Sequence, residues 1–325
     1  MKPELVFYDL SVCKAASRTS AAEWFSTLME TVADLIDEGI CKAELHADRN
    51  LYELDLIPDE YGFQEWVDDP ATDHDLRILA WHLTTMTPVA KRFYADVQHT
   101  DDFVRSEFFC GTERCEALGV ALCWDGIAVS LPSSKSWCVP EIAIAQHLYD
   151  EDLTTCRCIS HRVRHASMPE HVDSVIDNWR HAALEKITSV TELIEHWSLL
   201  LPQLDLCVER DRKTLPSLSN RDTLYSVLGR LYSLNRSCER WQRGGTGGPE
   251  YDFRARPESK ETLARDELKQ QRIATCPRRG EAVFEMHGNV QPAGYRMYWF
   301  ENAVEQRFTI GYIGPHLGTV RHKAQ

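Results

Sequence analysis

The stretch at residues 284–317, FEMHGNVQPAGYRMYWFENAVEQRFTIGYIGPHL, constrains the fold more than any other part of the chain. Residues 284–287, 295–300 and 307–313 are rich in Tyr, Trp, Phe, Ile and Thr, with polar residues between them. This composition is typical of strands that bury one face. Residues 289–294 and 301–306 separate the three runs. We therefore predict a three-stranded β-meander in this region.

Strand alternation divides YRMYWF into two faces, because successive side chains of a strand point in opposite directions. One face carries Arg296, Tyr298 and Phe300, and the other carries Tyr295, Met297 and Trp299. The face with Met297 and Trp299 is expected to be the core, which directs Arg296 outward. The glycines on either side of Tyr312–Ile313 predict a bulge or the close approach of another segment.

The rest of the chain is mainly helical by pattern, after a first strand at residues 4–12. Ser20 and Glu23 have the spacing of a capping box that opens a helix ending near Gly39. Helices are predicted over residues 73–86 and 89–109, and a charged helix over residues 257–272. Residues 153–160 are expected to form a strand, and Ser167 to cap the helix that follows it.

The clearest break in the chain is the glycine-rich stretch at residues 243–256, RGGTGGPEYDFRAR. It predicts an α+β protein with a large, acidic, mixed helical domain over residues 1–240. A linker over residues 241–256 would join it to a small antiparallel β-rich module over residues 257–325.

Charge differs along the chain. Residues 236–325 hold 15 Lys/Arg and 11 Asp/Glu, a net charge of +4. The whole chain holds 36 Lys/Arg and 50 Asp/Glu, so the first 235 residues hold 21 Lys/Arg and 39 Asp/Glu, a net charge of −18. The acidic part would repel nucleic acid, whereas the C-terminal part could bind it.

The sequence contains no apolar run of the roughly 20 residues that cross a bilayer, and its N-terminus lacks the apolar core of a secretion signal. A cytoplasmic location without membrane contact is expected. Eleven cysteines are scattered through the chain, and this odd number argues against a closed disulfide framework. Reduced and mostly buried thiols are expected.

The strands ending in YRMYWF and FTIGYIGPHL, preceded by a charged helix, resemble the meander of RelE/ParE-type bacterial toxins. The resemblance covers about residues 257–320 and implies a RelE-like module. The phrase IGYIGPHL is also similar to the ending of an uncharacterised family of longer bacterial proteins, for which we expect phage-defence or toxin-like roles.

The toxin resemblance implies a ribonuclease that cuts RNA without a metal. Arg296 would then stabilise the charge of the transition state, and His287 or His316 would be the general base or acid. Tyr312 could stack on a base or donate a proton. The alternative is structural, with Arg296 paired to Glu285 or Glu301 and His316 capping a turn.

Two other polar groups suggest ligands, and each has a simpler interpretation. Cys156, Cys158, His161 and His165 form CRCISHRVRH, but the C-x-C spacing is tight for one zinc ion, so core cysteines with surface histidines are expected. The same interpretation applies to Cys110, Cys115 and Cys123. Arg162, Arg164 and His165 precede the helix start at Ser167, where a phosphate could bind, but an ordinary cap is expected.

The chain contains no sequence motif for a nucleotide or a catalytic metal, so no cofactor and no metal are predicted. We expect a bacterial antiviral-defence or toxin-type protein whose C-terminal module binds nucleic acid, which could be RNA, and could act as a metal-independent endoribonuclease. The alternative is a non-enzymatic subunit that recognises a protein partner encoded nearby, within an antiphage complex. Nine tryptophans and an acidic surface suit that second role.

Overall fold

Two short apolar strands lie in the middle of the larger sheet. β1 (Leu5–Phe7) and β8 (Ile127–Val129) pair in parallel, and every residue of both is buried. Unbroken apolar runs of this kind are typical of parallel strands that are covered on both faces. The computed structural model describes residues 2–86, 103–150, 155–207, 220–244, 247–276, 280–291 and 294–320.

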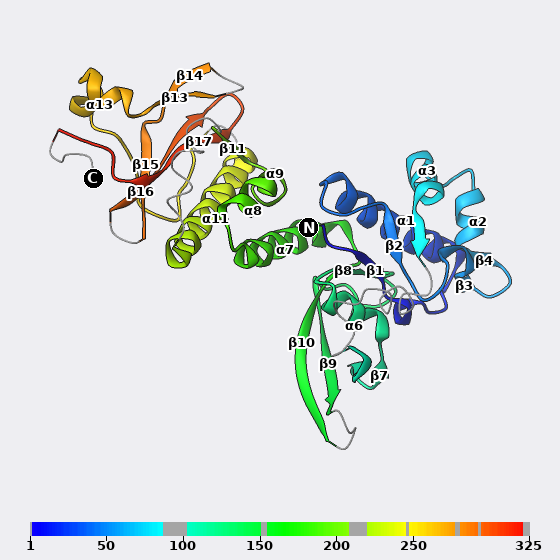
Figure 1. The fold of residues 1–325 in the computed structure, drawn as a ribbon. Helices are drawn as coiled ribbons and strands as arrows, with labels where there is room; N and C mark the ends of the chain where they lie inside the picture. Colours follow the sequence, from blue (N-terminus) through cyan, green and yellow to red (C-terminus); the bar gives the residue numbers. More distant parts are fainter. Residues whose placement is uncertain are drawn as a thin grey trace. The chain divides into compact units, whose positions relative to one another are not determined.

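The chain forms two compact units, Met1–Trp179 and Arg180–Gln325. The helical and strand elements of the first unit, drawn from blue to green in Figure 1, follow in chain order. They are β1, η1 (Asp9–Ser11), α1 (Arg18–Asp37), β2 (Glu44–His46), η2 (Leu51–Glu53), β3 (Asp55–Ile57), β4 (Tyr61–Gly62), α2 (Phe63–Asp68), α3 (His74–His82), β5 (Thr84–Met86), β6 (Ser106–Cys110), β7 (Glu113–Arg114), α6 (Glu116–Cys123), β8, β9 (Glu141–Tyr149), β10 (Cys156–Ala166) and η3 (Pro169–His171). Helix α7 (Val172–Lys186) spans the boundary between the units.

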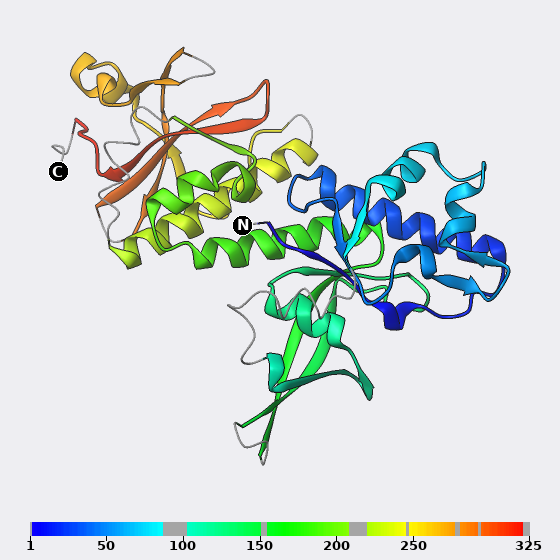
Figure 2. The same ribbon diagram turned by 45° about the vertical axis from the view of Figure 1, so that its right-hand side comes forward.

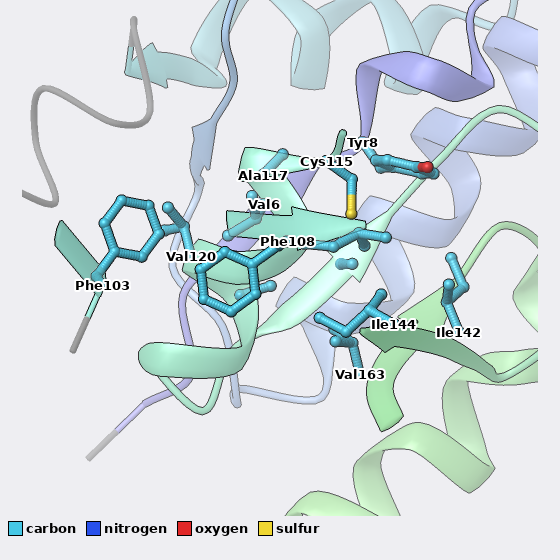
Figure 3. Close-up of a cluster of buried hydrophobic side chains, with 13 residues drawn as sticks. Val6, Tyr8, Phe103, Phe108, Cys115, Ala117, Val120, Ile142, Ile144 and Val163 are labelled. Atoms are coloured by element: carbon cyan, nitrogen blue, oxygen red, sulfur yellow. The ribbon is translucent and has the colours of Figure 1, made fainter. Parts of the chain in front are cut away.

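The sheet of the first unit has the strand order β5-β2-β1-β8-β10-β9-β6-β7. The first five strands are parallel, and β9, β6 and β7 continue the sheet in antiparallel pairs. β9 and β10 form the long hairpin in Figures 1 and 2. Helix α6 packs near the middle of this sheet, where Phe108, Val120 and Ile144 belong to one buried cluster (Figure 3).

The second unit is built on a five-stranded sheet with the order β11-β17-β16-β15-β12. Its elements are α8 (Val190–Glu195), α9 (Trp197–Leu200), β11 (Leu204–Leu206), α11 (Arg221–Gly244), β12 (Ala255–Pro257), α12 (Lys260–Leu263), α13 (Asp266–Gln270), β13 (Ile273–Cys276), β14 (Gly280–Val283), β15 (Met286–Val290), β16 (Tyr295–Asn302) and β17 (Arg307–Pro315). Helix α11 packs against β11, β15 and β17. The chain is therefore an α+β protein, and the predicted antiparallel meander is confirmed as β15–β17.

The meander differs from the prediction in having both faces covered. Met297 and Trp299 are fully buried as expected, but Tyr298 on the opposite face is also only 1% exposed. The reason is a second apolar cluster, in which Phe284 and the hairpin β13–β14 cover this face. The predicted bulge is present, because the register with β17 shifts between Tyr298 and Trp299, opposite Gly311.

The predicted linker packs against the sheet instead of forming an open tether. Helix α11 extends to Gly244, and the rings of Tyr251 and Phe253 lie against Trp299. The Trp299 indole donates a hydrogen bond to the Tyr251 hydroxyl at 3.1 Å. The boundary between the units consequently falls at residue 179, not near residue 240, because α11 belongs with the C-terminal sheet.

Several predicted helix limits change because local caps and strand pairing decide them. Helix α1 begins one turn early, since the Ser17 side chain accepts the Ser20 amide at 3.2 Å. The helix predicted over residues 73–86 ends at His82, and β5 follows it. In the region predicted as a helix over residues 89–109, residues 89–102 lie outside the described part, and β6 begins at Ser106. The charged segment 257–272 contains two short helices, α12 and α13.

None of the helices in the described ranges has both the length and the apolar character needed to cross a membrane.

Candidate functional site

A pocket of about 510 Å³ opens at one end of the C-terminal sheet and brings together three of the predicted site residues. Its lining comes from the β12–α12 connection and α12, from β15 and β16, and from the segment after β17. The lining residues are Glu258, Ser259, Glu261, Thr262, His287, Arg296, His316, Thr319 and Val320.

The strand register explains why these side chains converge. His287 lies opposite Tyr298, and Arg296 lies opposite Asn289, so His287 and Arg296 are diagonal neighbours on one face of β15 and β16. Arg296 also lies opposite Gly314 of β17, which has no side chain to cover it. The backbone amide of His316 donates to the Gly294 carbonyl at 2.7 Å, which returns the chain after β17 to the start of β16.

Arg296 is half-buried and supplies a positive charge to the pocket. Across the residues that the structure describes, its guanidinium forms no ion pair with Glu285 or Glu301. Glu301 instead accepts a hydrogen bond from the Tyr251 hydroxyl. An arginine in a half-buried pocket that is not paired with these two carboxylates is suited to binding an anionic group through parallel N–H donors.

The imidazole of His287 is uncharged at neutral pH. Burial lowers the pKa of His287 to about 4, and the positive charges of Arg296 and Arg272 act in the same direction, against the negative charge of Glu258. A neutral imidazole can accept a proton or a hydrogen bond, but a pKa this low makes it a weak base.

A buried ion pair supports the wall of the pocket. Arg272 is completely buried, and its Nη2 and Nε atoms lie 2.6 and 2.9 Å from Glu258 Oε2. The same guanidinium donates to the carbonyls of Leu268 and Gly318, each at 2.9 Å. Arg272 also lies over the Tyr298 ring, 5.4 Å from its centroid. These contacts connect α13, the β12–α12 connection and the C-terminal segment.

Tyr312 lies outside the residues that line the pocket. Its side chain is buried, its hydroxyl donates to the Pro315 carbonyl at 2.8 Å, and its ring meets Tyr298 edge to face. The structure therefore places Tyr312 as a support for the turn that carries His316. This contact favours a structural role over the base-stacking or proton-donating role predicted for it.

Two parts of the site were not predicted from the sequence. They are the lining residues between Glu258 and Thr262, and the buried Arg272 that pairs with Glu258. The only local signal was Ser259, whose side chain accepts the Thr262 amide at 3.2 Å as the cap of α12. The pairing of Glu258 with Arg272 crosses 14 residues and follows no spacing rule.

Within the described residues, the Cys–His run in β10 does not bring three potential ligand atoms together, and its burial is the reverse of the prediction. Cys156 and Cys158 are exposed on the outer part of the β9–β10 hairpin, whereas His165 is completely buried where β10 enters the core. His161 contacts Gln146 Oε1 through Nε2 at 2.8 Å. Cys115 belongs to the buried cluster of the first unit, with Cys110 and Cys123 packed against it, as predicted.

The polar groups near Ser167, where a phosphate could bind, already have partners within the protein. Ser167 donates its hydroxyl to the Trp137 carbonyl at 2.7 Å, and Met168 is the cap of η3 instead. Arg164 pairs with Asp125 at 2.8 Å and Arg162 with Glu141 at 3.4 Å. These contacts favour the structural interpretation over a phosphate site.

One group with metal-ligand geometry occurs within the described ranges, and the sequence analysis did not identify it. Potential ligand atoms of Glu4, Glu44 and His46 lie within 4.8 Å of one another. Glu4 already contacts His46 Nε2 at 3.2 Å and Lys42 Nζ at 3.8 Å. The contact with the Lys42 ammonium partly neutralises the Glu4 carboxylate without an ion.

Comparison of the chain with protein-family models, with curated proteins and with solved structures finds no match. The function of the pocket must therefore be argued from its own residues.

Proposed function

We propose that the chain is a bacterial defence- or toxin-type protein whose C-terminal unit binds RNA in this pocket and cleaves it without a metal. The observation that carries the proposal is the convergence of His287, Arg296 and His316 in one pocket. The toxin-type role rests on the resemblance of YRMYWF and IGYIGPHL to such proteins.

The chemistry follows from the side chains. The RNA 2′-hydroxyl would attack the adjacent phosphorus while His287 accepts its proton, and the leaving 5′-oxygen would take a proton from His316. Arg296 would bind the non-bridging oxygens, whose charge increases in the transition state. Negative charge from a bound phosphodiester would also raise the pKa of His287 from its low value in the free protein, which strengthens it as a base.

Cleavage of a labelled single-stranded RNA by the full chain tests this proposal. The double variant Arg296→Ala/His316→Ala is expected to lose cleavage while keeping the circular dichroism spectrum of the wild type. Arg254→Ala is the matched control, because Arg254 is an exposed arginine of the same unit that does not line the pocket. Cleavage that persists in the double variant, or that chelators abolish in the wild type, would contradict the proposal.

A second candidate function is recognition of a protein partner within an antiphage complex. The observation that favours it is helix α3, where Ile78 and Trp81 are 36% and 56% exposed. Large exposed apolar side chains are common anchors of interfaces. Co-purification of a protein encoded nearby with the wild type, but not with Trp81→Ala, is the expected result for this role.

A further inference from the structure

The second unit contains two buried cysteines whose sulfur atoms lie unusually close together. Sγ of Cys276 is 2.8 Å from Sγ of Cys207, and the two residues are 69 positions apart in the chain. Carbon atoms, which are smaller than sulfur, pack at about 3.5–4.0 Å. A separation of 2.8 Å is therefore much closer than ordinary contact and approaches the roughly 2.05 Å of a disulfide bond.

Each cysteine is held in place by its backbone. Cys207 follows β11 directly, and its amide donates to the Ile310 carbonyl of β17 at 3.0 Å, which extends the parallel ladder by one residue. Cys276 is the last residue of β13 and pairs with Gly280 of β14. The sulfur atoms meet because the ends of β11 and β13 meet.

We propose that Cys207 and Cys276 form a reversible disulfide when the protein meets a peroxide. One thiolate attacks hydrogen peroxide, forms a sulfenic acid and releases hydroxide. The second thiolate then attacks the sulfenic sulfur, and the oxygen leaves as hydroxide, which takes up a proton to form water. In balance, two thiols and one peroxide give one disulfide and two waters, with the sulfurs oxidised and the peroxide reduced.

The bond would join two sheets that share no backbone ladder in the described part of the second unit. β13 and β14 form their own two-stranded sheet, whereas Cys207 is attached to the five-stranded sheet through β17. The cysteines also belong to the apolar cluster that contains Tyr298, Tyr312 and Leu317. Tyr298 lies opposite His287 in the strand pair, and Leu317 follows His316 in the chain. The bond would therefore stiffen the base of the pocket.

The test is a map of disulfides in the full chain after limited treatment with hydrogen peroxide. Exposed Cys156 and Cys158 would react first, so both are replaced by serine. Remaining thiols are blocked with a maleimide in denaturant, and the digest is analysed by mass spectrometry. The expected result is a linked peptide pair containing Cys207 and Cys276, loss of the maleimide labels at these two residues, and reversal by dithiothreitol.

Two controls keep the result specific to the folded geometry. The same treatment in urea should give mixed links, and exposed Cys13 should report that the oxidant acted. Cys207→Ser should abolish the link, whereas Cys238→Ser, another buried cysteine of the same unit, should leave it intact. The proposal is wrong if Cys207 and Cys276 both remain open to maleimide, or one stops at a sulfinic acid, under conditions that consume Cys13.

The stability of the protein gives an independent readout. A bond that closes a long loop restricts the unfolded chain, so oxidation should raise the midpoint of thermal unfolding. The rise should be present in Cys238→Ser and absent in Cys207→Ser. An equal midpoint before and after confirmed bond formation would contradict this expected stabilisation.

Discussion

His165 ties two segments of the first unit together through a buried imidazole. Its Nδ1 lies 2.6 Å from the Val139 carbonyl, which can only accept, so Nδ1 carries the proton. Its Nε2, 2.8 Å from Ser130 Oγ, then accepts from that hydroxyl. Burial lowers the pKa of His165 to about 4, so the ring is neutral in the folded protein at physiological pH.

This arrangement predicts a loss of stability in acid. The folded pKa of His165 lies below its ordinary value of 6.5, so the unfolded chain binds more protons between about pH 6.5 and 4. The free energy of unfolding should fall by up to about 3 kcal/mol across that window, to which His287 adds with the same sign. Urea unfolding at pH 7.5 and 4.5 measures the change. His165→Gln should reduce the pH dependence by about one proton, and an unchanged dependence would contradict the assignment.

The buried pair of Glu258 and Arg272 should dominate the stability of the pocket wall. Glu258→Gln leaves the Arg272 charge buried without a counter-charge, and we expect a cost of about 3 kcal/mol in the free energy of unfolding. The matched control is Asp252→Asn, which breaks the solvent-exposed pair with Arg240 and should cost less than about 1 kcal/mol. Chemical denaturation of the wild type and of the two variants measures both losses of stability. Equal losses in the two variants would contradict a dominant role for the buried pair.

At the scale of the elements, the contact between Phe284 and Gly311 holds the cover of the meander in place. A Cβ atom at Gly311 would overlap the Phe284 ring. Gly311→Ala should therefore destabilise the protein by about 1–3 kcal/mol through overpacking.

The comparison for Gly311 is Gly229, which lies within helix α11 and has open space within 4 Å of the position that a Cβ atom would take. Gly229→Ala should stabilise the protein by about 0.5–1 kcal/mol, since alanine favours a helix interior. Thermal unfolding of both variants measures these changes, with a lower midpoint expected for Gly311→Ala and a higher midpoint for Gly229→Ala. A neutral Gly311→Ala variant would show that Phe284 can move aside at little cost.

The meander was predictable because its information is local. Alternation along YRMYWF placed Arg296 and Met297 on opposite faces, and the turn residues separated the strands near their observed ends. β11 and β12 were missed because strands of three residues show no period, and β11 finds its partner about 100 residues later in β17. The parallel pairing of β1 with β8 joins distant segments, such as Leu5 and Ile127, and no local pattern specifies it.

The candidate site was likewise predictable only where local pattern determines it. His287 and Arg296 come from strand alternation, and His316 from the turn after Pro315, so local pattern was enough to select them. Glu258 and Arg272 belong to a contact between distant segments, and neither has a motif. Burial also reversed one expectation, because the exposure of Cys156 and His165 depends on how far the β9–β10 hairpin extends beyond the core.

For the whole molecule, the uneven charge sets how RNA binding should respond to salt. The first 235 residues carry a net charge of −18 and the last 90 a net charge of +4, so under the proposed function we expect the phosphate contacts within the C-terminal unit. The logarithm of the affinity should fall linearly with the logarithm of the salt concentration. Arg296→Ala should reduce that slope by roughly 0.7, the value for one phosphate contact on a single strand. Filter binding over a range of salt concentrations measures it, and an unaltered slope would place the phosphate elsewhere.

The most direct test of the central claim is nuclear magnetic resonance of the histidine side chains in the full chain. A 2′-O-methyl RNA oligonucleotide, which binds but cannot be cleaved, is titrated into protein labelled at its imidazole nitrogens. The account predicts that the His287 and His316 signals shift together with one dissociation constant, and that neither shifts in Arg296→Ala. RNA that saturates the protein while leaving both signals unmoved would contradict the claim that this pocket is the functional site.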